Sequence, residues 1–269
     1  MRGSAAEQLA QAGLIAFTAG FFVFLMAPIL IVVLVSFSSL GYIAFPIPSY
    51  TLKWFRRVWE YAPFLNGLWV SIKLAVGSTV LAAMLGVPAA LALGRARSGW
   101  ANVLATFLLA PLSMPMIVLG FALLFYLSAL GFGLSFTALL IAHTVIGIPY
   151  LLRTVIGVYR SLPPDFEEAA AILGAGRWRT MLYVTLPLIR PGVFAGGLFA
   201  FLVSFDNLPI SYFFGTPSTS TLPVVMLSYI QDQFDPSIAA VSTVQMLLAL
   251  VVLLVVDRIY GLRQLGAPS

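Results

Sequence analysis

The sequence contains no cysteine and only one histidine among its 269 residues. Without cysteine the chain can form no disulfide, no thiolate metal site and no thiol redox motif. The single histidine, His143, is not accompanied by a cluster of further metal-ligand residue types, so a metal site is not expected either. We therefore expect no catalytic centre, no metal and no cofactor. The absence of cysteine does not identify a compartment.

Charge is also scarce. Charged residues make up 9% of the chain and hydrophobic residues 61%, with a mean hydropathy of +1.04. Soluble domains carry about a quarter charged residues. Because so few charges cannot cover a surface in water, the composition predicts an integral membrane protein. The net charge of +5 is spread over the loops without a basic patch, so nucleic acid is not an expected partner.

The sequence has no G-x-x-x-x-G-K-[ST] phosphate loop, so it cannot bind ATP through that motif. If the chain takes part in active transport, another polypeptide must supply the energy. A secondary carrier acting alone is one alternative, but such carriers commonly show two related halves, and no internal repeat is visible. An intramembrane enzyme is another alternative, but it needs a nucleophile with its base or a metal set.

Six apolar runs are long enough to cross about 30 Å of hydrocarbon, which takes about 20 helical residues. These runs are 13–36, 67–94, 101–129, 137–158, 192–214 and 238–260. Glycine and proline inside them are tolerated in membrane bundles, and two of the runs can be broken or kinked. The first run exceeds the apolar core of a signal peptide, so we expect a retained first span. We predict one all-α membrane domain, 1–269, with about six spans.

The arginines indicate the topology. Loops on one side of the predicted membrane hold Arg2, Arg95, Arg97, Arg160, Arg177, Arg179, Arg190, Arg258 and Arg263. The positive-inside rule places this side in the cytoplasm, together with both termini and the loop 160–190. Three cations on the opposite side lie in the segment 50–59, where they alternate with aromatic residues. We expect this segment to lie in the membrane interface as an aromatic belt; contact with an external partner is the alternative.

The segment 165–191 is charged and helix-prone, between runs that are almost free of charge. Asp165 is a candidate N-cap, and Glu168 follows three residues later as in a capping box. The helix should end at Gly174 or Gly176, because glycine adopts the left-handed C-terminal conformation without a Cβ penalty. The sequence therefore predicts a short helix in this loop.

A second short helix is expected to start at Arg177 and to stop at Pro187, before Pro191 begins the next span. The two helices would form a helix-turn-helix across the cytoplasmic mouth. Its alanines give a narrow helix that can enter a groove, and its glutamates can pair with cations. A surface loop that merely connects two spans is the alternative.

This loop resembles the EAA loop of permease subunits in binding-protein-dependent ABC importers. The family pattern is Glu-Ala-Ala, three residues, Gly, nine residues, Ile, one residue, Leu-Pro. This sequence supplies Glu168, Ala169, Ala170, Gly174, Val184, Leu186 and Pro187, with only the isoleucine changed, to valine. The resemblance implies a type I ABC importer permease fold whose cytoplasmic loop docks onto an ATPase. It gives coupling roles to the motif residues, with Glu167 and Arg177 beside them.

The resemblance also implies partners. They are a second permease subunit, two ATP-binding subunits, a periplasmic substrate-binding protein and the lipid bilayer. It implies a multi-pass protein of the bacterial inner membrane that is a transport subunit and not an enzyme.

Further stretches look like the polyamine branch of this family, the spermidine/putrescine permeases. These stretches are Tyr50-Thr51-Leu52 with Trp54-Phe55, Ser71 with Ala75, Pro111 with Pro115 and Gly120, His143 with Pro149-Tyr150, and Ser204-Phe205-Asp206-Asn207. The resemblance covers nearly the full length and implies a polyamine as cargo. Asn207 stands where many polyamine permeases are expected to have an acidic residue, so an amino-acid derivative, an opine, a phosphonate or thiamine stay open.

Polar and aromatic groups near the apolar spans are the candidates for the substrate pathway. They are Asp206, Asn207, Phe205, Tyr212, His143 and Tyr150. A carboxylate near membrane depth is costly and usually faces a cavity or a partner, so Asp206 is the first candidate. Aromatic rings could add cation–π contacts to a cationic solute. The alternatives are that Asp206 caps a helix end and that His143 forms a packing hydrogen bond between helices.

Overall fold

The structure is a computed structural model that describes residues 5–96 and 98–260. Arg2, Arg97 and Arg263, which contributed to the predicted topology, lie outside the described residues. Among the described residues every regular element is a helix, and one isolated antiparallel bridge joins Ser38 to Tyr50. The predicted all-α class is confirmed.

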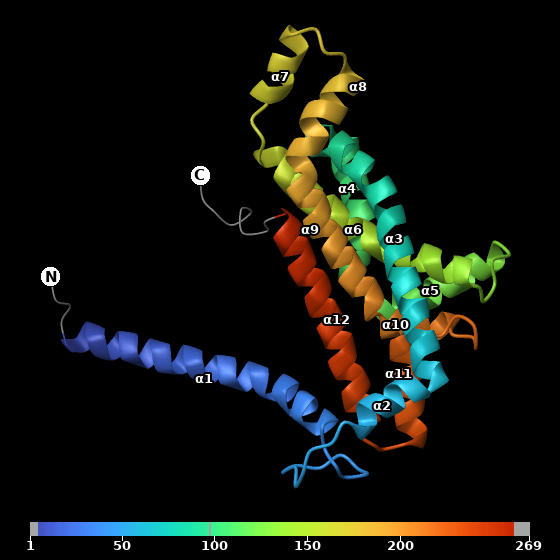
Figure 1. Cartoon of the computed structure of the whole chain (residues 1–269). Coiled ribbons are helices and arrows are strands. Elements are labelled where there is room, and N and C mark those ends of the chain that lie inside the picture. The colour runs from blue at the N-terminus through green and yellow to red at the C-terminus, as the bar shows by residue number, and fades with distance from the viewer. Residues whose placement is uncertain (1–4, 97, 261–269) are drawn as a thin grey trace. The chain divides into compact units, whose positions relative to one another are not determined.

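The elements follow one another along the chain as coloured in Figure 1. They are α1 (Ala5–Ser36), α2 (Lys53–Glu60), α3 (Ala62–Gly94), α4 (Gly99–Leu109), η1 (Ala110–Ser113), α5 (Met116–Ala129), α6 (Phe136–Ser161), α7 (Asp165–Ile172), α8 (Arg177–Thr180), η2 (Met181–Thr185), α9 (Leu186–Phe205), α10 (Leu208–Phe214), α11 (Leu222–Asp232) and α12 (Ser237–Tyr260). η1 is a 3₁₀-helix and η2 a π-helix.

Five helical stretches in the described chain are long and apolar enough to cross a membrane, and a bent pair makes a sixth candidate. The predicted number of about six spans is therefore confirmed. The third predicted run is broken, because α4 with η1 meets α5 at an angle of 112°. Proline explains the break. Pro111 lies at the start of η1, and Pro115 holds the extended N-cap conformation before α5.

The predicted bounds of the fifth run, 192–214, are wrong. A continuous helical stretch runs from Arg177 to Phe205, and the chain then breaks at Asp206 and Asn207 before α10. The prediction that Pro187 stops a helix is also wrong. The π-turn of η2 lets the amide of Leu186 bond to the carbonyl of Met181, five residues back. Pro187, which has no amide hydrogen, lies at the start of α9, directly after this π-turn.

The chain divides into two compact units, and the first contains residues up to 62 together with 229–247. In this unit most of the segment 50–59 forms the helix α2. The indole nitrogen of Trp54 donates to the carbonyl of Ser38 at 2.6 Å, which fixes α2 to the end of α1. Arg57 on α2 donates to the side chain of Gln233 at 3.0 Å.

The second unit contains residues 63–228 and the chain from 248 onward. Its centre is the close packing of α6 against α9. A Cβ at Gly196 would lie 2.2 Å from Oγ1 of Thr154, and one at Gly192 would lie 2.9 Å from Val158. Glycines spaced four apart let two membrane helices approach closely, so this spacing sets the distance between α6 and α9.

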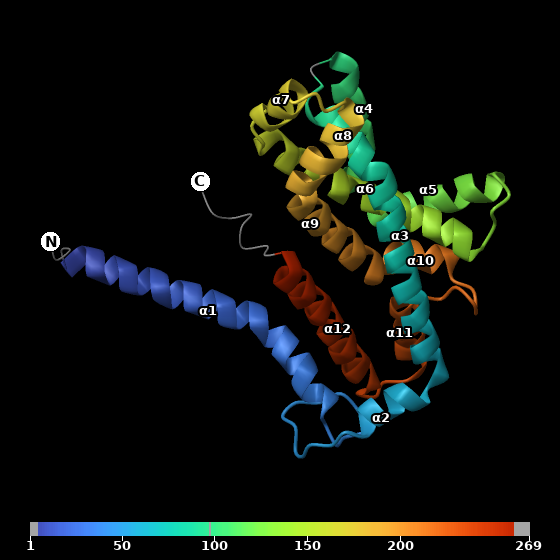
Figure 2. The same ribbon diagram turned by 45° about the horizontal axis from the view of Figure 1, so that its top comes forward.

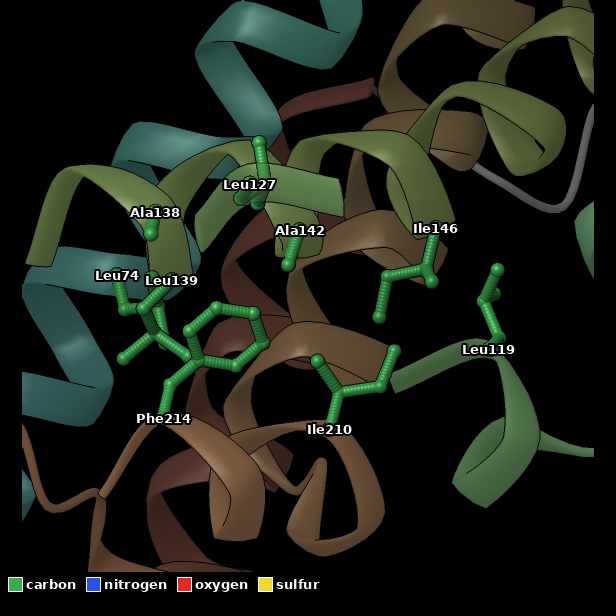
Figure 3. Packing of buried hydrophobic residues seen from close by; sticks show 9 residues of the cluster. All are labelled: Leu74, Leu119, Leu127, Ala138, Leu139, Ala142, Ile146, Ile210 and Phe214. Carbon is green, nitrogen blue, oxygen red and sulfur yellow. The ribbon is translucent and has the colours of Figure 1, made fainter. Parts of the chain in front are cut away.

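A buried apolar cluster fills the second unit beside this contact. Figure 3 shows its side chains converging from α3, α5, α6 and α10. They are Leu74, Leu119, Leu127, Ala138, Leu139, Ala142, Ile146, Ile210 and Phe214. The short helix α10 is thus held in the core by Ile210 and Phe214, both fully buried.

Candidate functional site: the α7–α8 loop and the α9–α10 break

The helices α7 and α8 lie at the end of the second unit where α3 ends and α4 begins (Figures 1 and 2). They form the helix-turn-helix that the sequence predicts. The predicted capping box, however, is wrong. Pro164 occupies the N-cap position of α7 and no side chain caps it, while Asp165 is the first helical residue. Asp165, Glu167 and Glu168 instead place negative charge in the first turn, where the helix dipole favours it.

The predicted end of α7 at Gly174 is confirmed. Gly174 has φ +81°, a left-handed conformation that glycine adopts without a Cβ penalty. Its amide bonds to the carbonyl of Ala171 at 3.0 Å, and the amide of Ala175 bonds to Ala170 at 3.0 Å. These two bonds form a Schellman motif, so Gly174 sets the direction in which the chain leaves α7.

Large apolar side chains project from this loop. Ile172 and Leu173 are 86% and 87% exposed, and Trp178 is 75% exposed. Ile172 and Leu173 lie at the end of α7, which belongs to no candidate span, and Trp178 lies in the first turn of the 177–205 stretch. Exposed apolar groups gathered in this way typically mark a protein or membrane contact.

Glu167 and Glu168 differ sharply although they are neighbours. Glu168 is exposed, and its side chain forms no hydrogen bond or ion pair with any residue that the structure describes. Glu167 is half-buried and accepts hydrogen bonds from Thr185 at 2.6 Å and from Tyr159 at 3.2 Å. Its second oxygen forms an ion pair with Arg95. The carboxylate of Glu167 therefore points into the unit, and that of Glu168 points outward.

The other coupling candidates also differ in burial. Ala169 and Arg177 are exposed, and Ala170 is buried. Leu186 and Pro187 are half-buried at the start of α9. A cavity of about 350 Å³ lies between this loop and the helix ends, lined among others by Tyr159, Glu167, Arg177 and Thr185.

Three of the substrate-pathway candidates, Phe205, Asp206 and Asn207, lie at the break between α9 and α10. Asp206 is exposed at the C-cap position of α9. Asn207 is buried, and its Oδ1 accepts from the amide of Ile210 at 3.0 Å as the N-cap of α10. Phe205 is buried and stacks on Phe201, with the ring centroids 5.6 Å apart. The side-chain oxygen of Asn207 therefore caps the new helix, and Asp206 lies exposed just before it.

The remaining three candidates lie on α6 and α10. Tyr212 is exposed, and its ring packs edge-on against Phe213. Tyr150 is half-buried and stacks on Phe199 at 6.5 Å. His143 has 0% exposure. Its Nδ1 lies 2.8 Å from Oγ of Ser204, and its Nε2 lies 3.1 Å from Oγ of Ser211. The imidazole thus joins α6 to both sides of the break.

Several residues of these two regions escaped the sequence-based prediction. Arg95 entered it only as a topology charge, and Tyr159 and Thr185 did not enter it. Ser78, whose hydroxyl donates to Ser204 at 3.0 Å, was also missed. Each belongs to a contact between segments far apart in the chain, and no sequence motif signals such a contact. Among the described residues no group of three or more histidine or acidic side chains could hold a metal ion.

Known proteins match this chain over most of its length. Residues 82–263 match the family described as the inner membrane component of binding-protein-dependent transport systems. The spermidine/putrescine transport system permease protein PotC of Escherichia coli (strain K12) is 29% identical over 238 residues, which cover 88% of this chain and 90% of PotC. The molybdenum transport system permease protein ModB of Mycobacterium bovis is 35% identical over 219 residues, which cover 76% of this chain and 81% of ModB.

A solved structure shares the fold. The crystal structure of a bacterial ABC transporter involved in the import of the acidic polysaccharide alginate aligns with a TM-score of 0.75. The alignment covers 96% of this chain and 99% of that chain. Because the sequence identity is only 18%, the similarity shows the fold alone. The predicted type I ABC importer permease fold and the resemblance to PotC are both confirmed. The chain belongs to the family of inner membrane components of binding-protein-dependent transport systems, and it is a membrane-spanning permease subunit of an ABC importer, not an enzyme.

Proposed function

We propose that this permease receives a small solute from a periplasmic binding protein and releases it to the cytoplasm, on energy supplied by separate ATP-binding subunits. The first proposed cargo is a polyamine such as spermidine or putrescine. In this proposal the chain pairs with a second permease subunit, and both termini and the α7–α8 loop lie in the cytoplasm. The coupling residues are Glu167, Glu168, Ala169, Ala170, Gly174, Arg177, Leu186 and Pro187.

One observation carries the docking part of the proposal. Ile172, Leu173 and Trp178 expose large apolar surface on a loop whose cations indicate the cytoplasmic side. A connecting loop with no partner would lose nothing by carrying polar residues there. An ATP-binding subunit that covers these side chains would remove them from water. The outward carboxylate of Glu168 is available to pair with a cation of that subunit.

Co-purification tests the docking. The chain is expressed with the ATP-binding and permease subunits encoded beside it, and the ATP-binding subunit that co-purifies is measured. We expect Leu173→Asp to reduce the bound subunit by about tenfold or more, since it places a charge in an apolar contact. Tyr42→Asp is the control, because Tyr42 is also exposed but lies before α2 in the other unit. Equal co-purification of both variants and the unaltered chain would contradict the docking.

For the solute, we propose that the exposed Asp206 and Tyr212 contact the cargo and that Tyr150, His143, Phe205 and Asn207 shape the pathway beside them. A carboxylate and an aromatic face suit a cation. The names of permeases similar to this chain mention different solutes. The name of PotC mentions spermidine and putrescine, and the name of ModB mentions molybdenum. A different small solute, such as an amino-acid derivative, an opine, a phosphonate, thiamine or molybdate, is therefore the alternative.

The binding protein decides between these solutes. Thermal-shift measurements on the cognate binding protein with putrescine, spermidine, molybdate and the alternative solutes should show a raised melting temperature with one class only. Stabilisation by a polyamine supports the first proposal. Stabilisation by molybdate or another anion, without a response to polyamines, would replace it.

A further inference from the structure

The carboxylate of Glu167 joins three segments of the second unit that are distant in the sequence. Arg95 directly follows α3, Tyr159 belongs to the last turn of α6, and Thr185 ends the π-helix that leads into α9. Tyr159 and Thr185 both donate to Oε1, at 3.2 Å and 2.6 Å, and Arg95 pairs with Oε2. One residue of α7 therefore contacts the ends of the three long helices at this end of the unit.

The contacts of Arg95 strengthen the same junction. Its guanidinium carbon lies 4.4 Å from the ring centroid of Tyr159, a cation–π distance. Its second terminal nitrogen donates to the carbonyl of Leu162 at 3.3 Å, just before α7. Arg160 adds a bond in the opposite direction, since its Nε donates to the carbonyl of Gly94 at the end of α3 at 2.7 Å. The ends of α3 and α6 are thus tied to each other and to α7.

The position of Thr185 gives this junction a path into α9. Thr185 is the last residue of η2, and the π-turn carries the bond from Leu186 to Met181 that replaces an ordinary helical bond. π-turns inside α-helices are frequent at functional sites. Because Pro187 offers no amide hydrogen, the helix has fewer bonds holding its register at this point than elsewhere. A pull on the hydroxyl of Thr185 therefore acts on a turn that lacks an ordinary backbone hydrogen bond.

We propose that Glu167 is the internal positioning residue of the loop, which transmits displacement of α7 to α3, α6 and α9 through Arg95, Tyr159 and Thr185. This inference rests on the proposed docking of an ATP-binding subunit and deepens it. It divides the two adjacent glutamates by role. Glu168 faces the partner and contributes to attachment, and Glu167 faces inward and links attachment to movement of the bundle.

The division of roles predicts two different defects. Glu167→Gln keeps the shape and the acceptor oxygen but removes the ion pair with Arg95. In the complex reconstituted with its partner permease, ATP-binding subunits and binding protein, the variant should co-purify with the ATP-binding subunits at the ratio of the unaltered chain. The stimulation of ATP hydrolysis by the binding protein, taken as the ratio to the rate without it, should fall by about fivefold or more, the lower range of coupling between sites.

Glu168→Gln is the matched control, since it makes the same chemical change one residue away. It should raise the concentration of ATP-binding subunit needed to saturate the complex and leave the stimulation ratio at saturation unchanged. A general effect of altering the loop would make the two variants alike. If Glu167→Gln matches the unaltered chain in stimulation, or if it loses the subunit as Glu168→Gln does, the positioning role is excluded.

A double-mutant cycle tests the route. If Glu167 acts through Arg95, then Arg95→Met combined with Glu167→Gln should reduce stimulation no further than either change alone. Thr185→Val removes the hydroxyl at constant shape and leaves the ion pair intact. It should give a partial loss, and it serves in place of Glu167→Gln if that variant does not accumulate. Fully additive losses, or a Thr185→Val variant with full stimulation, would overturn the route.

A spin-label measurement separates this inference from the docking proposal. The chain has no cysteine, so the pair Ile172→Cys and Asn102→Cys can be labelled without other changes. Both residues are exposed and lie in the second unit, on α7 and α4. The distance distribution in the isolated chain should broaden with Glu167→Gln and not with Glu168→Gln. If the unaltered chain binds no ATP-binding subunit but Glu167→Gln broadens the distribution, the docking proposal fails and the positioning role of Glu167 is still supported. If Glu167→Gln does not broaden the distribution, Glu167 does not position α7.

Discussion

Nδ1 of His143 on α6 lies 2.8 Å from Oγ of Ser204 on α9, although the two residues are 61 positions apart. The other ring nitrogen reaches Ser211 on α10, so one buried imidazole contacts the helices on both sides of the α9–α10 break. Ser78 on α3 extends the chain of hydroxyls by donating to Ser204. Polar groups buried in this way must remain paired, which makes the position of α10 dependent on His143.

We predict that His143→Leu destabilises the protein. Ser204 keeps its bond to Ser78, but Ser211 loses the partner that the imidazole provides. A buried hydroxyl left without a partner costs about 1–3 kcal/mol. The apparent melting temperature of the purified His143→Leu variant in detergent should therefore fall. The melting temperature of His143→Gln should fall less, because glutamine can bond to one of the two serines.

An exposed position supplies the control for this change. Tyr126→Leu on α5 removes a polar group from a side chain that is exposed, and it should leave the melting temperature nearly unchanged. If His143→Leu is as stable as Tyr126→Leu, the hydrogen bonds of His143 do not hold the break together.

We predict that Gly196→Ala separates α6 from α9. The new Cβ would lie 2.2 Å from Oγ1 of Thr154 and 2.9 Å from Cα of Leu151, and the second of these is backbone that cannot rotate away. Overpacking of this kind costs about 1–3 kcal/mol. Gly157→Ala on α6 is the matched control, because its Cβ would meet no atom within 4 Å. Alanine in place of glycine inside a helix stabilises it by roughly 0.5–1 kcal/mol, so the Gly157→Ala protein should be as stable as the unaltered chain or slightly more stable.

Thermal unfolding of the two glycine variants in the same detergent checks the prediction. We expect the melting temperature to fall for Gly196→Ala and to stay equal or rise slightly for Gly157→Ala. Equal melting temperatures would mean that the two helices can move apart without loss.

Hydropathy predicted the spans well because length and apolarity alone decide whether a helix can cross a bilayer. It could not predict where a span breaks. Pro111 and Pro115 bend the third run by 112°, whereas Pro88 and Pro149 lie inside continuous helices. The residue type is the same in each case, and only the packing of neighbouring helices distinguishes a kink from a break.

The loop illustrates the same limit for the site. Gly174 was predictable because a left-handed residue at a helix end has a strong sequence preference. The capping box of Asp165 and Glu168 was not formed, since Pro164 occupies the N-cap and Asp165 is already helical. The neighbouring carboxylate of Glu167 pairs with Arg95 instead. That pair is separated by 72 positions, and its existence depends on the α3–α6 contact, which local patterns do not encode.

We predict that Gly174→Val disrupts attachment of the ATP-binding subunit. Space is open around this residue, but φ +81° is strongly unfavourable for a β-branched side chain, at a cost of about 1–2 kcal/mol or more. The Schellman turn should open and redirect Leu173. Gly176→Val is the matched control, since Gly176 is also in open space but has φ −69° and an extended ψ of 161°.

Co-purification with the ATP-binding subunit distinguishes the two variants. Loss with Gly174→Val and retention with Gly176→Val is the expected pattern. Retention in both would show that the direction of the turn does not matter for docking.

We predict that the link between α2 and the end of α11 from residue 229 onward, both in the first unit, weakens at alkaline pH. Tyr229, which lies outside the candidate spans, donates to Asp235 at 2.9 Å and accepts from Arg57 at 3.3 Å. Burial, the largest cause, raises the pKa of Tyr229 above its ordinary value of 10.0. A raised pKa in the folded state favours the protonated form, so this stabilisation is complete below pH 10 and is lost as pH rises through the folded pKa.

Absorbance of tyrosinate, followed against pH, should show one late-titrating tyrosine fewer in Tyr229→Phe than in the unaltered chain. Tyr42→Phe is the control, because Tyr42 is an exposed residue of the same unit. An unchanged number of late-titrating tyrosines in Tyr229→Phe would contradict the raised pKa of Tyr229.

The last prediction concerns the charge of the cargo. Asp206 is exposed where α9 ends, and Asp206→Asn keeps its size while removing its charge. For a cationic solute, the loss of a charge-assisted hydrogen bond of about 1.5–3 kcal/mol should reduce uptake by about ten- to a hundredfold. For an oxyanion, the same change removes a repulsion, so uptake should be unchanged or faster. Uptake of labelled putrescine and of molybdate into cells that lack their own transporters for both solutes measures the sign, and the melting temperature of the variant confirms that the α9–α10 break is intact. A variant that is stable and imports putrescine at the unaltered rate would show that the carboxylate of Asp206 does not contact the solute.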